Sequence, residues 1–111
     1  MSEPVPGSVL VVLITVPDAA CAERVATALV EERLAACVGR LGPLESLFRW
    51  KGALERAPEL LLIAKTTAAR FAALAARVKA LHPYEVPEIV ALPVAAGFAP
   101  YLDWVAAETA P

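Results

Sequence analysis

The sequence predicts a ferredoxin-like fold of the α+β class: a βαββαβ sandwich with an extra C-terminal helix. Apolar, β-branched runs alternate with segments of helical periodicity in the order strand, helix, strand, strand, helix, strand. A tight turn at Lys51-Gly52 joins two of the extended segments, which makes them an antiparallel hairpin. The chain has 111 residues, the usual size of one domain, and we assign residues 9–111 to that domain.

The first strand and the first helix are predicted from the spacing of apolar residues, which changes to helical spacing after residue 16. Val9–Val16 is β-branched and apolar, and it ends before a proline. Asp18 suits the N-cap of a helix that we expect over about residues 19–35. Apolar side chains recur there at helical spacing, namely Ala22, Val25, Ala26 and Leu29. Residues 1–8 contain two prolines and predict a flexible tail.

The middle of the chain predicts the two strands of the hairpin. Cys37–Trp50 is extended, and proline at position 43 is tolerated there only at an edge, a bend or a bulge. We therefore expect an irregularity near Gly42-Pro43. Leu54–Thr67 returns as the third strand, around the apolar run at residues 60–64.

The second half of the chain repeats the helix and strand signals. Thr67 suits the N-cap of the second helix, whose apolar stripe is Phe71, Leu74, Ala75, Val78 and Leu81. This helix should end near His82, because a residue that precedes proline avoids helical geometry. Glu88–Val94 is the fourth strand, and Pro100 suits the first turn of a last helix.

The amount of apolar sequence predicts an oligomer. The chain is 59% hydrophobic, with a mean hydropathy of +0.60. Its longest apolar runs, Val9–Ile14 and Leu60–Ala64, are far shorter than the ~20 residues of a membrane-spanning helix. The first and third strands are apolar at successive positions, so both sheet faces require burial, yet the helices of this fold cover only one. Another subunit should cover the second face, although this argument does not give the number of subunits.

Several function classes are excluded by what the sequence contains. Ten lysines and arginines are scattered over a chain of net charge −2, so we expect no nucleic-acid partner. Cys21 and Cys37 lie among small residues and are interpreted as reduced core residues. There is one histidine, and the sequence has no GxSxG, GxxxxGK[ST] or GxGxxG motif. We therefore expect a protein that is not an enzyme, and the lack of a signal-peptide pattern in residues 1–8 favours the cytoplasm.

Three stretches together resemble the CutA family of divalent-cation tolerance proteins. The resemblance runs from about Val9 to about Val105. The stretches are Leu34-Ala35-Ala36-Cys37-Val38, then Trp50-Lys51-Gly52 with Glu59 and Lys65-Thr66-Thr67, and finally His82-Pro83-Tyr84-Glu85-Val86-Pro87-Glu88 followed by Pro93, Gly97, Tyr101, Leu102 and Trp104. The resemblance implies a homotrimer similar to that of PII signalling proteins, in which long second and third strands reach neighbouring subunits. It also implies a link to copper and other divalent cations.

The resemblance further implies a metal site of three ligands, of which two match. Glu59 and His82 correspond to a family glutamate and histidine, whereas the family cysteine position falls on Ile14, which cannot bind metal. A carboxylate and an imidazole suit Cu(II) or another divalent metal, but two protein ligands form a weak site, which water or symmetry copies would complete. Alternatively, His82 bonds the last carbonyls of its helix, and Glu59 forms an ion pair with a lysine or arginine, at the sheet edge or between subunits. Lys65 shares the face of Glu59 on a regular strand, or pairs with an acid such as Glu88.

An aromatic set gives the second functional hypothesis. Trp50, Tyr84, Tyr101 and Trp104 suit packing and interface anchors. Alternatively, Tyr84, Trp104 and Lys65 line a shallow pocket between subunits that accepts a small anion. The two hypotheses are thus a metal-binding trimer in divalent-cation tolerance and a PII-like regulatory or scaffold trimer that binds a small ligand or a partner protein at intersubunit clefts. A very stable trimer with an indirect effect on tolerance is a third alternative.

Overall fold

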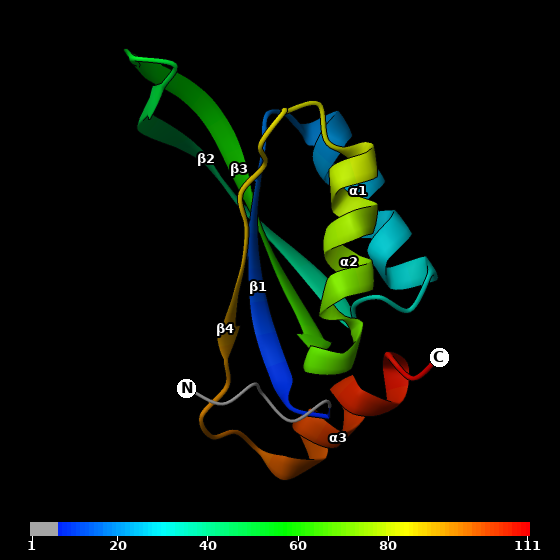
Figure 1. The fold of residues 1–111 in the computed structure, drawn as a ribbon. Helices are drawn as coiled ribbons and strands as arrows, with labels where there is room; N and C mark the ends of the chain where they lie inside the picture. Colours follow the sequence, from blue (N-terminus) through cyan, green and yellow to red (C-terminus); the bar gives the residue numbers. More distant parts are fainter. Residues whose placement is uncertain (1–6) are drawn as a thin grey trace.

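Four antiparallel strands form one sheet with helices packed on one side, as the computed structural model of the chain shows (Figure 1). The structure describes residues 7–111, so most of the predicted tail at residues 1–8 lies outside the described residues. The elements are β1 (Val9–Val16), α1 (Ala19–Glu31), β2 (Cys37–Trp50), β3 (Ala53–Thr67), α2 (Ala68–Leu81), β4 (Ile89–Pro93) and α3 (Ala99–Glu108). The sheet order β2-β3-β1-β4 confirms the predicted ferredoxin-like fold with its extra helix.

The first helix is shorter than predicted. It begins at the expected cap, where the Asp18 carboxylate accepts a hydrogen bond from the Cys21 amide at 2.8 Å. It ends at Glu31, not near residue 35, because Arg33 adopts a left-handed backbone with φ of 59°. The amides of Leu34 and Ala35 both bond to a carbonyl of the last helical turn. These two apolar residues are buried in the core, which is why the hydrophobic pattern continues past the helix end.

The core lies between the sheet and the helices α1 and α2. Residues 10, 12, 14 and 16 of β1 point to this side and meet Leu62 and Ala64 of β3. Leu29 of α1 and Leu74 and Val78 of α2 complete the cluster from the helical layer, all fully buried. Burying each large aliphatic side chain is worth about 1.5–3 kcal/mol, so this cluster is the main source of stability. A smaller cluster of Val9, Ala36 and Val105 packs α3 against one end of the sheet.

The helices α1 and α2 leave the opposite face of the sheet open, and α3 contacts this face at the end where β1 begins, through Val9 and Cys37. Figure 1 shows α1 and α2 on the same side, as predicted. On the other side Leu41 is 58% exposed and Leu92 is 52% exposed, with Val90 also exposed. Apolar side chains thus occupy both faces, and within the described part of the subunit the second face stays open over much of its area.

The β2–β3 hairpin extends beyond β1 as a projecting arm (Figure 1). The pairing of β1 with β3 ends at Val16 and Leu60, so the earlier residues of β3 have no β1 neighbour. The predicted irregularity lies at the base of the arm, where the register of β2 shifts between Leu41 and Leu44. No helix within residues 7–111 has the length and apolar character needed to cross a membrane.

The register shift reverses which side chains of β2 face the open side. Leu41 pairs with Leu61, and Leu44 pairs with Glu59, so odd residues before the shift and even residues after it share one face. Phe48 therefore points the same way as Glu59 does. The irregularity determines which residues line the space beside the arm.

Candidate functional site

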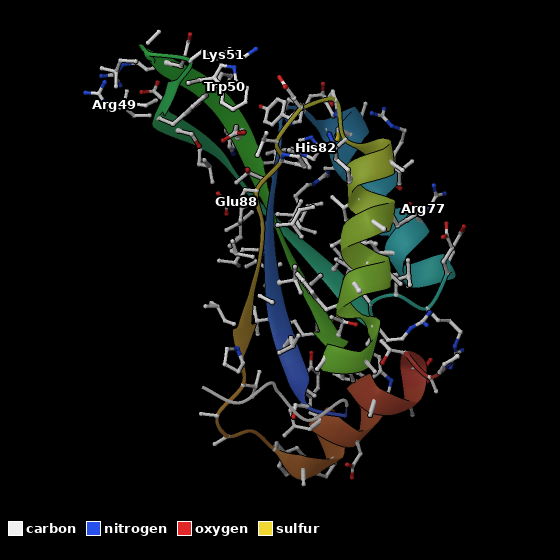
Figure 2. All side chains as sticks on the ribbon, viewed as in Figure 1. Arg49, Trp50, Lys51, Arg77, His82 and Glu88 are labelled. Atoms are coloured by element: carbon white, nitrogen blue, oxygen red, sulfur yellow. The ribbon has the colours of Figure 1, made fainter. Side chains whose placement is uncertain are left out.

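A cavity of about 480 Å³ lies between the arm and the segment that links α2 to β4. We call it the arm pocket. Figure 2 shows Trp50 on the arm and His82 and Glu88 on the linking segment. The arm supplies Phe48, Trp50, Glu55, Arg56, Ala57 and Glu59, the end of β1 supplies Thr15, and the linking segment supplies Tyr84, Glu85, Val86 and Glu88. The structure thus brings together four of the predicted site residues, namely Trp50, Glu59, Tyr84 and Glu88.

A chain of hydrogen bonds joins β1, the linking segment and the arm. The Nε2 atom of His82 lies 2.7 Å from the carbonyl oxygen of Thr15, and its Nδ1 atom accepts from the Tyr84 amide at 3.1 Å. The hydroxyl of Tyr84 donates to Oε2 of Glu59 at 3.0 Å. The rings of His82 and Tyr84 are also in contact, with centroids 4.7 Å apart. These bonds fix the linking segment across the end of β1.

His82 is held by its neighbours through both ring nitrogens. A carbonyl only accepts, so Nε2 carries the hydrogen and Nδ1 is the acceptor, which describes a neutral imidazole. The side chain is 7% exposed. We expected His82 to bond the last carbonyls of its own helix, but its partner is the Thr15 carbonyl of β1. Metal coordination by His82 would require one of the two bonds to break.

Glu59 is a buried carboxylate that has no basic partner within residues 7–111. It is 6% exposed, and its bond to Tyr84 occupies one oxygen. Within residues 7–111 no salt bridge reaches it, and an ion pair with a neighbouring subunit stays a prediction. Lys65 pairs in the sheet with Val11 and Cys37, in the other half of the strand. The described residues show no ion pair between Lys65 and either Glu59 or Glu88.

The Tyr84 hydroxyl is held in its neutral form. Burial is the largest cause that raises the pKa of Tyr84 to about 12, and the hydrogen bond and negative charge of Glu59 act in the same direction. A neutral phenol can donate its proton to the carboxylate, whereas a phenolate would be repelled by it. The protonated Tyr84 therefore keeps its hydrogen bond to Glu59.

The other predicted aromatic residues form a separate cluster at the opposite end of the sheet. The rings of Tyr101 and Trp104 on α3 lie 5.7 Å apart, and the Tyr101 hydroxyl is 3.6 Å from the Cys37 sulfur. The ring of His82, which accepts from the Tyr84 amide, bonds to Thr15 near the end of β1, whereas α3 packs against Val9 at its beginning. One subunit does not bring Tyr84 and Trp104 together, and the expected pocket between subunits stays a prediction.

Sequence reasoning missed Phe48 and Glu55 as pocket residues. They are cross-strand partners beyond the register shift, so they face the same side as Glu59. Pro43 predicts an irregularity in this strand. It does not predict by how many residues the register shifts, so the sequence does not tell which side chains beyond it face Glu59.

The metal ligands available in one subunit do not form a three-ligand site. Within residues 7–111 no group of three histidine, cysteine, aspartate or glutamate side chains is arranged to hold a metal ion. The side chain of Ile14 is buried in the core and points away from Glu59. The donors that suit a cation in the arm pocket are carboxylate oxygens, and Glu59 is the most buried of them.

The fold and the pocket define a small α+β protein with a projecting hairpin, an open apolar sheet face and an acidic, aromatic cavity. The CutA1 divalent ion tolerance protein model matches residues 10–108, and the chain belongs to this family. The divalent-cation tolerance protein CutA of Thermus thermophilus is 58% identical over 99 residues, which cover 89% of this chain and 96% of that protein.

Human protein CutA is 46% identical over 101 residues, which cover 91% of this chain and 56% of the human protein. The chain thus spans just over half the length of that relative. The structure of the Thermus thermophilus divalent cation tolerance protein superposes with a TM-score of 0.90 at 56% identity, covering 92% of this chain and 99% of that one. The Archaeoglobus fulgidus structure, described as a periplasmic CutA, gives 0.88 at 39% identity and covers 92% and 99%. The cytoplasmic location of this chain stays a prediction.

Proposed function

We propose that this member of the divalent-cation tolerance family acts without catalysis, as a homotrimer that binds copper(II) or another divalent metal ion. The observation that carries the proposal is the Glu59 carboxylate, which is buried at the arm pocket and has no basic partner among the described residues. A buried charge without a counter-charge is costly, so a bound cation would stabilise it. The names of the Thermus thermophilus relatives associate those proteins with divalent cations.

The exposed apolar face supports the assembly. Leu41, Val90 and Leu92 are large apolar side chains on one uncovered surface, a pattern typical of interaction sites. Burying several hundred Å² of such surface contributes about 25 cal/mol per Å² before the cost of association. Sedimentation at low protein concentration tests this point, since a well-folded 11.7 kDa particle would contradict the trimer.

The metal is proposed as a weakly held ligand centred on Glu59. Oxygen from water and donors from a neighbouring subunit would complete its coordination, because one subunit supplies too few ligands. His82 is proposed as a further ligand that joins after releasing one of its two hydrogen bonds.

Calorimetric titration with Cu(II) tests this site. We expect binding by the wild-type protein, a loss of at least about tenfold in affinity in Glu59→Gln, and weaker binding in His82→Ala. The control is Glu23→Gln, which removes an exposed carboxylate from α1 and should bind like the wild type. Negligible heat in both the wild type and His82→Ala would end the metal proposal, and unchanged affinity in Glu59→Gln would move the site elsewhere.

A second candidate function is a PII-like regulatory or scaffold trimer that binds a small ligand or a partner protein. The size of the arm pocket favours it, because about 480 Å³ is enough for a small organic molecule. A thermal-shift screen of metabolites in the presence of a chelator tests this function. No stabilising ligand, together with clear micromolar metal binding, would reject it.

A further inference from the structure

We propose that Lys79 is the positioning residue of the Glu59 site, because its ammonium group holds the linking segment where Tyr84 reaches Glu59. The inference rests on the proposed metal function and names a residue that acts on the same site through Tyr84. Its support comes from hydrogen bonds inside one subunit, so it does not depend on what covers the open sheet face.

Lys79 bonds to the chain beyond its own helix. It is the basic residue in the last turn of α2, a position from which a lysine often bonds the last helical carbonyls. Here its Nζ atom donates to the carbonyl oxygen of Tyr84 at 3.3 Å and to that of Glu85 at 2.6 Å, five and six residues further along the chain. The ammonium group therefore connects the helical layer to the linking segment.

Tyr84 is held by both its backbone and its side chain. Its carbonyl accepts from Lys79 of α2, and its amide donates to Nδ1 of His82 at 3.1 Å. Its hydroxyl donates to the Glu59 carboxylate of β3 at 3.0 Å. The bond to Glu59 thus depends on where the backbone of Tyr84 is fixed, and Lys79 supplies one of the two bonds that fix it.

Two prolines limit how the linking segment can adjust. Pro83 and Pro87 stand on either side of residues 84–86, and each proline ring fixes its own φ near −65°. The residue before a proline is restricted as well. A segment with so little backbone freedom shifts as a unit when it loses an anchor. Loss of the Lys79 bonds should therefore move the Tyr84 hydroxyl away from Glu59.

A lysine suits this role because its donors carry charge. Charged donors form shorter and stronger hydrogen bonds than neutral donors do, and the bond to Glu85 is the shorter of the two at 2.6 Å. Lys79→Arg retains the charge and the donors, whereas Lys79→Met retains only the apolar stem of the side chain. The two variants therefore separate the ammonium group from the packing of the stem.

Arg77 provides a matched control on the same helix. Its guanidinium bonds to both oxygens of the Glu32 carboxylate of α1 at 3.0 Å, and Figure 2 shows it on the side of α2 that faces away from the arm. Arg77→Met removes a cation two positions from Lys79 and leaves the bonds of the linking segment in place. It should affect the stability of the helical layer but not the position of Tyr84.

Hydrogen exchange of the Tyr84 amide, followed by NMR with a chelator present, tests the positioning. Each rate is divided by that of the Leu62 amide, a fully buried residue of β3 that reports unfolding of the sheet. We expect this ratio to rise at least about threefold in Lys79→Met and to stay near the wild-type value in Lys79→Arg and Arg77→Met. An unchanged ratio in Lys79→Met, or an equal rise in Arg77→Met, would overturn the proposal.

Titration of the same four proteins with Cu(II) tests the effect on the site. We expect at least about threefold weaker binding by Lys79→Met, recovery in Lys79→Arg and no change in Arg77→Met. Unchanged or tighter binding by Lys79→Met would overturn the role of Lys79 at the site. Negligible binding by the wild type would end the metal proposal alone, and the exchange ratio of the metal-free protein would still decide whether Lys79 positions Tyr84.

Discussion

Replacing Tyr84 by phenylalanine is expected to lower stability near neutral pH and to remove a loss of stability at alkaline pH. The hydroxyl of Tyr84 donates to the Glu59 carboxylate at 3.0 Å and joins the linking segment to the arm. A hydrogen bond to a charged group contributes about 1.5–3 kcal/mol, and partial exposure of this pair reduces that to about 1 kcal/mol. Phenylalanine keeps the ring contact with His82, so the change isolates the hydroxyl.

The alkaline effect follows from the raised pKa of Tyr84. The pKa rises from 10.0 to about 12 on folding, mainly through burial and then through Glu59. The folded state thus holds this proton more tightly than the unfolded state does. The contribution to stability is fully present below pH 10 and is lost as the pH rises from about 10 to about 12. Two pKa units correspond to about 2.7 kcal/mol, which partial solvent exposure reduces to about 1–2 kcal/mol.

Urea unfolding of both proteins between about pH 8 and 12 measures this difference. Protein concentration is held constant, because unfolding of an oligomer depends on it. The phenylalanine variant retains every other titrating group and is therefore its own control. We expect the advantage of the wild type to shrink by about 1–2 kcal/mol between about pH 10 and 12. Parallel curves over that interval would refute the proposed coupling of Tyr84 to Glu59.

Two further substitutions test the framework around the pocket. Thr66→Val removes a buried hydroxyl that donates to the Leu34 carbonyl at 2.6 Å. We expect the free energy of unfolding in urea to fall by about 1–2 kcal/mol. An unchanged urea midpoint would show that this hydrogen bond adds nothing to stability. Gly42→Ala places a Cβ 3.0 Å from a Leu60 methyl group, at a position where the backbone φ of residue 42 is +130°. Because side chains rarely adopt this φ, we expect thermal melting to show a destabilisation of about 1–3 kcal/mol. Gly7→Ala, which meets nothing within 4 Å, is the matched control, and equal melting of the two alanine variants would contradict the strain argument.

The order of strands and helices could be predicted, because the spacing of apolar residues and the residues at the turns agree with the fold. Val9–Val16 and Cys37–Trp50 have the bounds expected from the sequence, since proline and a Lys-Gly turn mark their ends. The end of α1 could not be predicted, because the left-handed residue is Arg33 and no glycine signals it. The apolar residues that follow belong to the core but not to the helix.

The candidate site could be predicted only in part, because its geometry depends on strand register. Motif matching selected Glu59 and Tyr84, which the structure joins by a hydrogen bond. It grouped Lys65 with them, but the pairing of β1 with β3 places Lys65 opposite Val11, away from the arm. The spacing of two residues along one strand predicts that their side chains share a sheet face. How far each side chain lies from the pocket depends on where the neighbouring strand ends.

The same strand provides the open face and the pocket, and the irregularity near Gly42 makes both possible. Before the shift Leu41 contributes an apolar side chain to the uncovered face; after it Phe48 and the other even residues take that orientation. A shift of one residue reverses the direction of every later side chain. Without it, Phe48 would face away from Glu59, and the pocket would lose aromatic wall while keeping its acids. The aromatic part of the pocket wall therefore depends on the irregularity at Gly42 and Pro43, which do not themselves line the pocket.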